Sequence, residues 1–545
     1  MRHSFALLTL AAALSAQADG PPYYDPDRSL NKQSEAASAA VEAIRKGAKA
    51  EEIAGYFAEK SAEVRDRAFE AVLERSDDQA LLEQLAAYVG DKDGFVAAGV
   101  AEVFAAARFA PARKLLEKRG LTANDPLAQL EAVWALAAIG DPESAKPLER
   151  LYSKSRDFRV KGDALIAWAE VDPDGARQEA TEALEHKLPP VQIAALVALQ
   201  KIEGKAALRG AKLLLETELK GGARAWSGRL VFAALDTIEA WTNRKSDADL
   251  AKELVDALIA RLEKAEGLPQ HRIGQTLTNL TGQRIAANAD MWRGWWQSQR
   301  EGFVPQDSPV AEDEPQAKPP QAGDDEGDEA EGGGRKGPKT GDADATRVRF
   351  HGIPIYSKRL TFAQDVSGGM NNPLDSDDAD SPSKMVFSKR ELIRVLGQLD
   401  GDVMGNVVFF STEYYRVADE LLPLKRARDK LVEFVRAQQT PKKVGKQGSH
   451  KGRSNLYDTL AFCMQDPEID TIFFLSEGGP NEGRFMRQTR FMRHLDKLNR
   501  YQRVQVHCLQ VSNSKGGARF LKEISELTGG RYYDLDAIKA AHPKK

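Results

Sequence analysis

The sequence predicts a multidomain protein in which an all-α solenoid is followed by an α/β domain with a doubly wound sheet. Three observations support this prediction: a two-helix pattern recurs in the first half, an acidic segment rich in Pro and Gly follows, and short β-branched runs then alternate with helices. A length of 545 residues also exceeds what one hydrophobic core usually holds together.

The start of the chain indicates a cleaved export signal over residues 1–18. Arg2 and His3 precede an apolar stretch, and the small residues Ala16 and Ala18 suit a signal peptidase. We therefore expect export to the periplasm, the cell surface or the extracellular space. The apolar stretch is too short to cross ~30 Å of hydrocarbon, and no membrane span is expected elsewhere.

Residues 30–303 show helical periodicity with an internal repeat. In "LEAVWALAAIGDPESAKPLERL", "GDALIAWAEVDPDGARQEATEAL" and "VQIAALVALQKIEGKAALRGAKLLL", an apolar helix ends at a short turn and an amphipathic helix follows. Ile139, Val171 and Ile202 occupy equivalent places. A period of roughly thirty residues with two helices predicts an α-solenoid and resembles HEAT repeats. An irregular helical bundle is the alternative.

Two features mark the end of this region. Trp292, Trp295 and Trp296 share one helical face, which we expect to cover the open end of the solenoid; a carbohydrate platform is the alternative. Residues 304–345 contain almost nothing to bury, so they are predicted to form a disordered acidic linker rich in Pro and Gly.

From residue 346 to 545 the pattern changes to strands that alternate with helices, which predicts a mostly parallel sheet. The expected strands cover 359–365, 406–411, 470–476, 504–511 and 529–535. The expected helices cover 384–399, 427–438, 456–465, 486–501 and 518–528. In such sheets, ligands bind at the carboxyl ends of the strands.

Three polar loops are expected to meet at that edge: "DVSGGM" from Asp365, "GRSNLYD" around Ser454, and "FLSEGGP" around Glu477. Their order and spacing resemble the von Willebrand factor A (vWA) domain over 347–535. The family's metal-ion-dependent adhesion site uses D-x-S-x-S, then a threonine, then an aspartate. The resemblance assigns Asp365, Ser367, Ser454 and Glu477 to a degenerate form of this site.

This chain departs from the family pattern at three positions. Gly369 removes one hydroxyl, Ser454 replaces threonine, and Glu477 replaces aspartate. Mg²⁺ requires near-octahedral oxygen ligands, so Mg²⁺ would need an extra water, and Mn²⁺ or Ca²⁺ would tolerate the site better. The departures favour an edge without metal, in which Asp365 and Ser367 hydrogen-bond to neighbouring loop groups.

Two basic clusters flank the same edge and form a candidate ligand-binding surface. The first contains Lys442, Lys443, Lys446, Lys451 and Arg453, and the second contains Arg484, Arg487, Arg490 and Arg493 at helical spacing. Such clusters attract acidic protein segments or polysaccharide without metal, and the acidic linker is one intramolecular candidate. A solvated helical face is the ordinary alternative for a charged stripe.

The sequence offers little support for an enzyme. It contains no HExxH, G-x-S-x-G or phosphate loop, and its histidines form no recognisable triad. Nucleic acid is disfavoured by the export signal and by the lack of aromatic residues among the lysines. The preferred hypothesis is an exported, non-enzymatic scaffold that binds protein partners.

Only two cysteines are present, Cys463 and Cys508, so a disulfide framework is excluded. We expect both to be buried free thiols. A single disulfide between them is the alternative.

Overall fold

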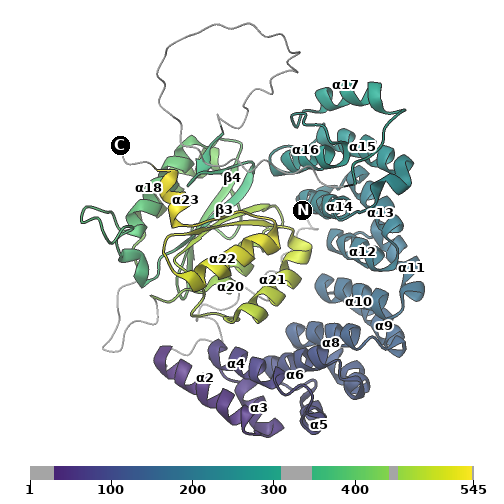
Figure 1. The fold of residues 1–545 in the computed structure, drawn as a ribbon, viewed down its shortest axis with the longest axis vertical. Helices are drawn as coiled ribbons and strands as arrows, with labels where there is room; N and C mark the ends of the chain where they lie inside the picture. The colour runs from purple at the N-terminus through teal and green to yellow at the C-terminus, as the bar shows by residue number, and fades with distance from the viewer. Residues whose placement is uncertain (1–29, 308–346, 441–451, 543–545) are drawn as a thin grey trace.

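The computed structural model describes residues 30–307, 347–440 and 452–542 (Figure 1). The predicted signal peptide, nearly all of the predicted linker, and Lys442, Lys443, Lys446 and Lys451 lie outside the described residues. Among the described helices, none combines the length and apolar composition needed to cross a bilayer.

Residues 30–307 form a curved stack of helices, called here the helical region (Figure 1). Its first α-helices are α2 (Leu30–Arg45), α3 (Ala50–Phe57), α4 (Ala62–Leu73), α5 (Gln79–Leu85), α6 (Gly94–Ala107), α7 (Arg113–Leu115), α8 (Pro126–Ile139) and α9 (Ala145–Lys154). The remaining ones are α10 (Phe158–Val171), α11 (Pro173–Glu182), α12 (Pro189–Ile202), α13 (Gly204–Glu216), α14 (Ser227–Glu239), α15 (Ala248–Leu262), α16 (Leu268–Thr281) and α17 (Ala289–Gln299).

The repeat that the sequence predicts is visible in these helices. Ile139, Val171 and Ile202 are the last residues of α8, α10 and α12, and each is followed by the shorter partner helix of its pair. Aspartate side chains accept hydrogen bonds from backbone N–H groups at the starts of α6, α8 and α10, as good N-caps do: Asp93, Asp125 and Asp157.

The tryptophan face of α17 packs inward at the end of the stack. Trp292 is fully buried and Trp296 nearly so. The indole N–H of Trp296 donates a hydrogen bond to Asp256 of α15 over 2.6 Å. The last helix is therefore fixed to the stack by both apolar and polar contacts.

Residues 347–542 form the α/β domain, whose seven-stranded sheet has the order β5-β4-β3-β7-β8-β9, with β6 also paired to β4. Its strands are β3 (Arg359–Asp365), β4 (Met404–Phe410), β5 (Tyr414–Arg416), β6 (Leu422–Pro423), β7 (Thr471–Ser476), β8 (Gln505–Gln510) and β9 (Tyr532–Tyr533). Pairing is parallel throughout except for β5 and β6 against β4. A separate hairpin joins β1 (Arg349–Phe350) to β2 (Ile353–Pro354).

Helices cover both faces of the sheet, so the strands are buried on both sides. The first face carries α18 (Lys384–Gln398), α19 (Leu424–Ala437) and α23 (Leu535–Ala540); the second carries α20 (Leu456–Cys463), α21 (Gln488–Gln502) and α22 (Lys515–Thr528). Neighbouring residues of one strand serve different cores, as Phe473 and Phe474 of β7 do. Cys463 and Cys508 are both buried and unpaired.

The α/β domain lies on the inner side of the curved stack, and α21 faces the helices of the repeats (Figure 1). Ion pairs and hydrogen bonds from α21 reach α4, α6, α8, α10 and α14. This arrangement decides what the basic residues of α21 contact.

Candidate functional site

The carboxyl ends of β3 and β7 lie side by side because the two strands are parallel. β3 ends at Asp365 and β7 ends at Ser476. The structure thereby brings together the four residues assigned from the sequence, Asp365, Ser367, Ser454 and Glu477, with Gly369, Lys384 and Ser476 beside them. We call these seven residues the strand-end edge.

Asp365 is fully buried and accepts three hydrogen bonds within the edge. Its Oδ1 accepts from the Ser367 backbone N–H over 2.7 Å. Its Oδ2 accepts from the Ser454 hydroxyl over 3.1 Å and from the Ser476 hydroxyl over 2.9 Å. Burial raises the pKa of Asp365, and the hydrogen bonds from Ser367 and Ser476 oppose that rise. Ser476 was not singled out from the sequence, although it directly precedes Glu477.

Glu477 is directed at a partner that the sequence did not indicate. Its Oε1 pairs with the ammonium of Lys384, the first residue of α18. Its Oε2 lies so close to Gly369 that a Cβ at this position would stand only 1.6 Å away. The carboxylate therefore fills the space where the family pattern places a second serine.

This arrangement does not fit a divalent metal. Mg²⁺ needs six oxygen ligands at about 2.0–2.1 Å, whereas the Glu477 carboxylate, which could supply one of them, is already paired with an ammonium. A Lys384 side chain that is only 10% exposed also puts a positive charge where a second cation would be repelled.

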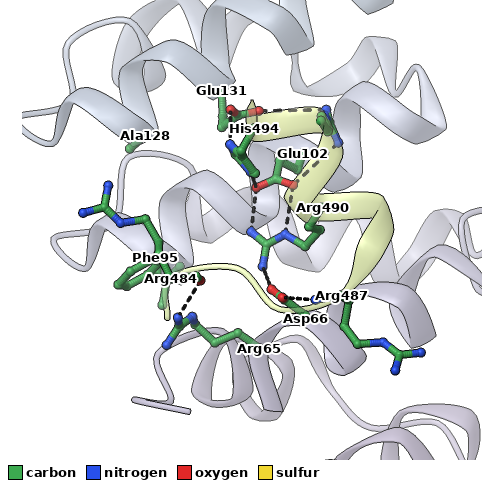
Figure 2. A network of polar contacts seen from close by, with 12 residues as sticks. Arg65, Asp66, Phe95, Glu102, Ala128, Glu131, Arg484, Arg487, Arg490 and His494 are labelled. Atoms are coloured by element: carbon green, nitrogen blue, oxygen red, sulfur yellow. Dashed lines mark hydrogen bonds and ion pairs between the residues drawn. The ribbon is translucent and has the colours of Figure 1, made fainter. Parts of the chain in front are cut away.

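The arginine stripe predicted as a ligand surface lies in a second site, the interface between α21 and the helical region (Figure 2). Arg490 is 2% exposed. Its guanidinium donates to Asp66 over 2.8 Å and to both oxygens of Glu102 over 3.1 and 2.6 Å. Arg493 lies 3.6 Å from Glu102 and 3.9 Å from Glu131.

The acids that face α21 come from five inner helices of the stack, with none from α12. We call them the acidic ladder: Asp66 of α4, Glu102 of α6, Glu131 of α8, Asp163 of α10 and Asp236 of α14. Polar side chains of α21, and Arg503 at its end, meet them in the same order: Arg490, His494, Lys497, Arg500, Tyr501 and Arg503. The helix thus runs along the stack and contacts one repeat after another.

The middle of the ladder is held by short contacts. The Lys497 ammonium donates to both Glu131 oxygens over 2.6 Å. The Tyr501 hydroxyl donates to Asp163 over 2.5 Å. Gly162 leaves the room for this contact, because a Cβ there would stand 2.5 Å from the Tyr501 oxygen. The two surfaces are therefore complementary in shape and in charge.

Burial and pairing set the ionisation of the interface. Burial lowers the pKa of Arg490, but Glu102 and Asp66 beside it raise that pKa by more. Burial also opposes charge on Glu102, yet Arg490 and His494 hold the pKa of this carboxyl well below its usual range. Burial lowers the pKa of His494 despite the nearby acids. Glu102 and Arg490 therefore stay charged near neutral pH.

The remaining predicted ligand residues within the described ranges, Arg453, Arg484 and Arg487, are also engaged. Arg453 is buried and pairs with Glu482 over 2.6 Å. Arg487 is 46% exposed and pairs with Glu70 of α4 over 3.2 Å. The Arg484 carbonyl accepts a hydrogen bond from Arg65 over 3.0 Å.

The prediction of an exposed basic stripe is corrected for Arg490, because a residue buried in ion pairs cannot meet an outside ligand. The acidic segment that faces the stripe is the helical region, whereas the predicted linker lies outside the described residues. A sequence signal existed. Glu102, Glu131 and Asp163 each stand among the buried, mostly apolar residues of their helix.

Two further features of the described residues have some properties of a site. His351, Glu391 and His542 could hold a metal by distance, but Arg394 already donates to both Glu391 oxygens over 2.7 Å. A cavity of about 500 Å³ lies between the two parts of the chain, near Arg272 and Arg503. Arg272 pairs with Asp236 and Glu239, and Arg503 pairs with Asp236, so both arginines are already engaged within the chain.

Comparison with known proteins gives no family. No protein-family model matches the chain, and no curated protein matches it. Of the solved structures, the PilB minor pilin from Streptococcus sanguinis shares 12% identity over 34% of this chain and 60% of that chain, with a TM-score of 0.26. The chain thus spans less than two thirds of the pilin structure.

An aerotolerance-related membrane protein from Bacteroides fragilis NCTC 9343, with multiple mutations to serines, shares 15% identity over 33% of this chain and 95% of that chain. Its TM-score is 0.23. An uncharacterized membrane spanning protein from Vibrio fischeri shares 17% identity with a TM-score of 0.16. Scores of this size carry no argument about fold or function.

Proposed function

We propose that this chain is an exported, non-enzymatic interaction protein in which a HEAT-like solenoid holds a vWA-type domain against its inner face. The solenoid fixes the orientation of the domain, and the strand-end edge serves as its binding surface for a protein partner. Export rests on the pattern of residues 1–18. The vWA assignment rests on the order of the three loops and on their meeting at one edge.

The acidic ladder is the observation that carries this proposal. Asp66 and Glu102 are completely buried, and burying an unpaired charge costs several kcal/mol in proteins. These acids find their cation on α21, across a sequence separation of 388 residues for Arg490 and Glu102. A solenoid that buries acids on its inner face in this way is built to hold a basic helix, and the same chain supplies that helix.

Two further side chains of the helical region, Arg229 and Asp66, hydrogen-bond to the backbone of the α/β domain. Arg229 of α14 is buried and donates to the Asp466 carbonyl over 2.7 Å. The Asp66 carboxylate accepts from the backbone N–H groups of Met486 and Arg487 over 2.7 and 3.0 Å, directly before α21 begins. A carboxylate at the start of a helix also interacts favourably with the helix dipole. Docking therefore orders the entry to α21 as well as its face.

Cleavage between the two parts of the chain tests the proposal. A protease site placed within 308–346 of the full chain allows the link to be cut after folding. We expect the two pieces to co-elute in size-exclusion chromatography at physiological salt. Lys497→Glu opposes Glu131 and should separate the pieces, whereas Lys522→Glu, on an exposed residue of α22, should not.

Immediate separation of the wild-type pieces would contradict the proposal. Equal co-elution of Lys497→Glu and Lys522→Glu would show that the ladder does not hold the domain. Circular dichroism of the separated pieces reports independently whether each piece is still folded.

A further inference from the structure

The strand-end edge departs from the adhesion-site pattern at Gly369 and Glu477, and it gains a buried lysine nearby. We infer that these features form one device, in which the ammonium of Lys384 supplies the cation of the edge from within the chain. The edge then needs no divalent metal to balance its acids. This inference concerns the α/β domain alone and does not depend on the docking of α21.

The steric part of the argument concerns Gly369 and Glu477. Glu477 Oε2 would stand 1.6 Å from a Cβ at position 369, and real Cβ contacts are never so short. Gly369 does not have a positive φ, so backbone conformation alone does not require glycine here. Glycine at this position therefore leaves the space that the longer carboxylate of Glu477 occupies, and a side chain there would have to displace that carboxylate. Gly368, its neighbour, has open space around the same position and no positive φ.

The placement of Lys384 is fixed by the same loop. The Lys384 N–H donates to the Asn372 carbonyl over 3.0 Å, and the Asn372 N–H donates to the Gly369 carbonyl over 3.0 Å. Pro373 and Ser383 form an isolated bridge that closes this loop onto the start of α18. The backbone of Lys384 is thus connected through Asn372 to Gly369. From this position the Lys384 ammonium reaches the Glu477 carboxylate.

The charges of the edge explain why a carboxylate ligand is not expected. The charged groups of this edge are Asp365, Glu477 and Lys384. Arg453 lies nearby but does not add to this balance, because Glu482 neutralises it. A divalent ion would give such an edge a surplus of positive charge, which is what attracts a carboxylate. One ammonium against two acids gives no surplus, even if Asp365 holds a proton.

A metal titration of the full chain is the first test. Wild type and Asp365→Ala are titrated with MgCl₂, MnCl₂ and CaCl₂ by calorimetry, and their melting temperatures are compared with and without chelator. We expect no saturable heat and no chelator-dependent shift in wild type. Saturable binding in wild type that Asp365→Ala abolishes would overturn the inference.

A double-mutant cycle tests the steric relation independently of any metal. Gly369→Ala should raise the unfolding equilibrium constant by about threefold or more, because a Cβ on this half-buried residue must displace the Glu477 carboxylate from its pair with Lys384. The penalty should vanish in a Glu477→Ala background, and Gly368→Ala should have no comparable effect in either background. A Gly369→Ala penalty that is absent, or that persists without the Glu477 carboxylate, would overturn the relation.

A second cycle tests the ion pair itself. Lys384→Met and Glu477→Gln should each destabilise the full chain, and the double variant should lose less than the sum of the two. We expect a coupling of at least about threefold in the unfolding equilibrium constant, typical of groups in contact. Additive effects would mean that Lys384 does not serve as the cation of this edge.

Discussion

The strand-end edge and the α21 interface both bury charged side chains, but they neutralise them in different ways. At the edge, Lys384 and Glu477 belong to the same domain, although 93 residues separate them in the sequence. At the interface, Arg490 of the α/β domain is neutralised by Asp66 and Glu102 of the helical region. The edge therefore keeps its neutral state by itself, whereas the interface is neutral only when the two parts are together.

This difference teaches how each region should respond to change. Breaking one side of a buried ion pair is far more costly than removing an exposed pair, because the remaining charge stays unpaired in a poorly solvated place. In the interface, that cost couples domain association to folding. In the edge, the same kind of change should alter only the α/β domain.

Arg490→Met should lower the unfolding free energy of the full chain more than any other variant considered below. A small loss would contradict the difference drawn between interface and edge. It leaves Asp66 and Glu102 buried without their cation, so we expect a loss of about 3–5 kcal/mol in unfolding free energy. Urea denaturation of the full chain measures it. Arg487→Met is the matched control, because Arg487 is 46% exposed and its pair with Glu70 should contribute at most about 1 kcal/mol.

Acid should weaken the α/β domain before it weakens the acidic ladder. Burial lowers the pKa of His507 from 6.5 to about 3. Between these values the unfolded chain binds a proton that the folded chain does not, so stability is present above pH 6.5 and is lost as pH falls toward 3. Glu102, whose pKa is held well below its usual range, keeps its pairing over most of this window.

The His507 contribution should amount to about 2 kcal/mol at pH 5 relative to pH 8. Urea denaturation of wild type and His507→Gln at both pH values measures it, and the variant should show a smaller loss. The same pH dependence in both chains would contradict the assignment. The cleaved wild-type pieces should still co-elute at pH 5.

Ser454→Ala, in the strand-end edge, should lower the unfolding free energy least of these variants. It removes one hydroxyl donor to Asp365 and leaves the bonds from Ser367 and Ser476, so we expect a loss of about 1 kcal/mol. Ser376→Ala, at an exposed loop position, is the control and should be nearly neutral. Neither variant should change co-elution of the cleaved pieces, and separation by Ser454→Ala would show that edge and interface are coupled.

Much of the α/β fold is predictable because its strands carry strong local patterns. The first strand was expected over 359–365 and lies at Arg359–Asp365. The short antiparallel strand Tyr414–Arg416 was missed, because three residues carry too little pattern to distinguish a strand from a turn. The expected last strand over 529–535 is reduced to Tyr532–Tyr533.

Tertiary contacts also shift element ends. The helix expected over 486–501 begins at Gln488, because the N–H groups of Met486 and Arg487 donate to Asp66 of the helical region. No pattern local to that segment could show this. The repeat itself was predictable, since Ile139, Val171 and Ile202 end equivalent helices.

The sequence by itself determined the order of the parts, the repeat and the loops that meet at the strand-end edge. These depend on periodicity and on residue types within short windows, which local physics controls. Only the tertiary structure decided that Arg490 is buried against Glu102 and that Lys384 pairs with Glu477. Both pairings join residues distant in sequence, and the value of a charge depends on the solvent exposure and neighbours that folding gives it.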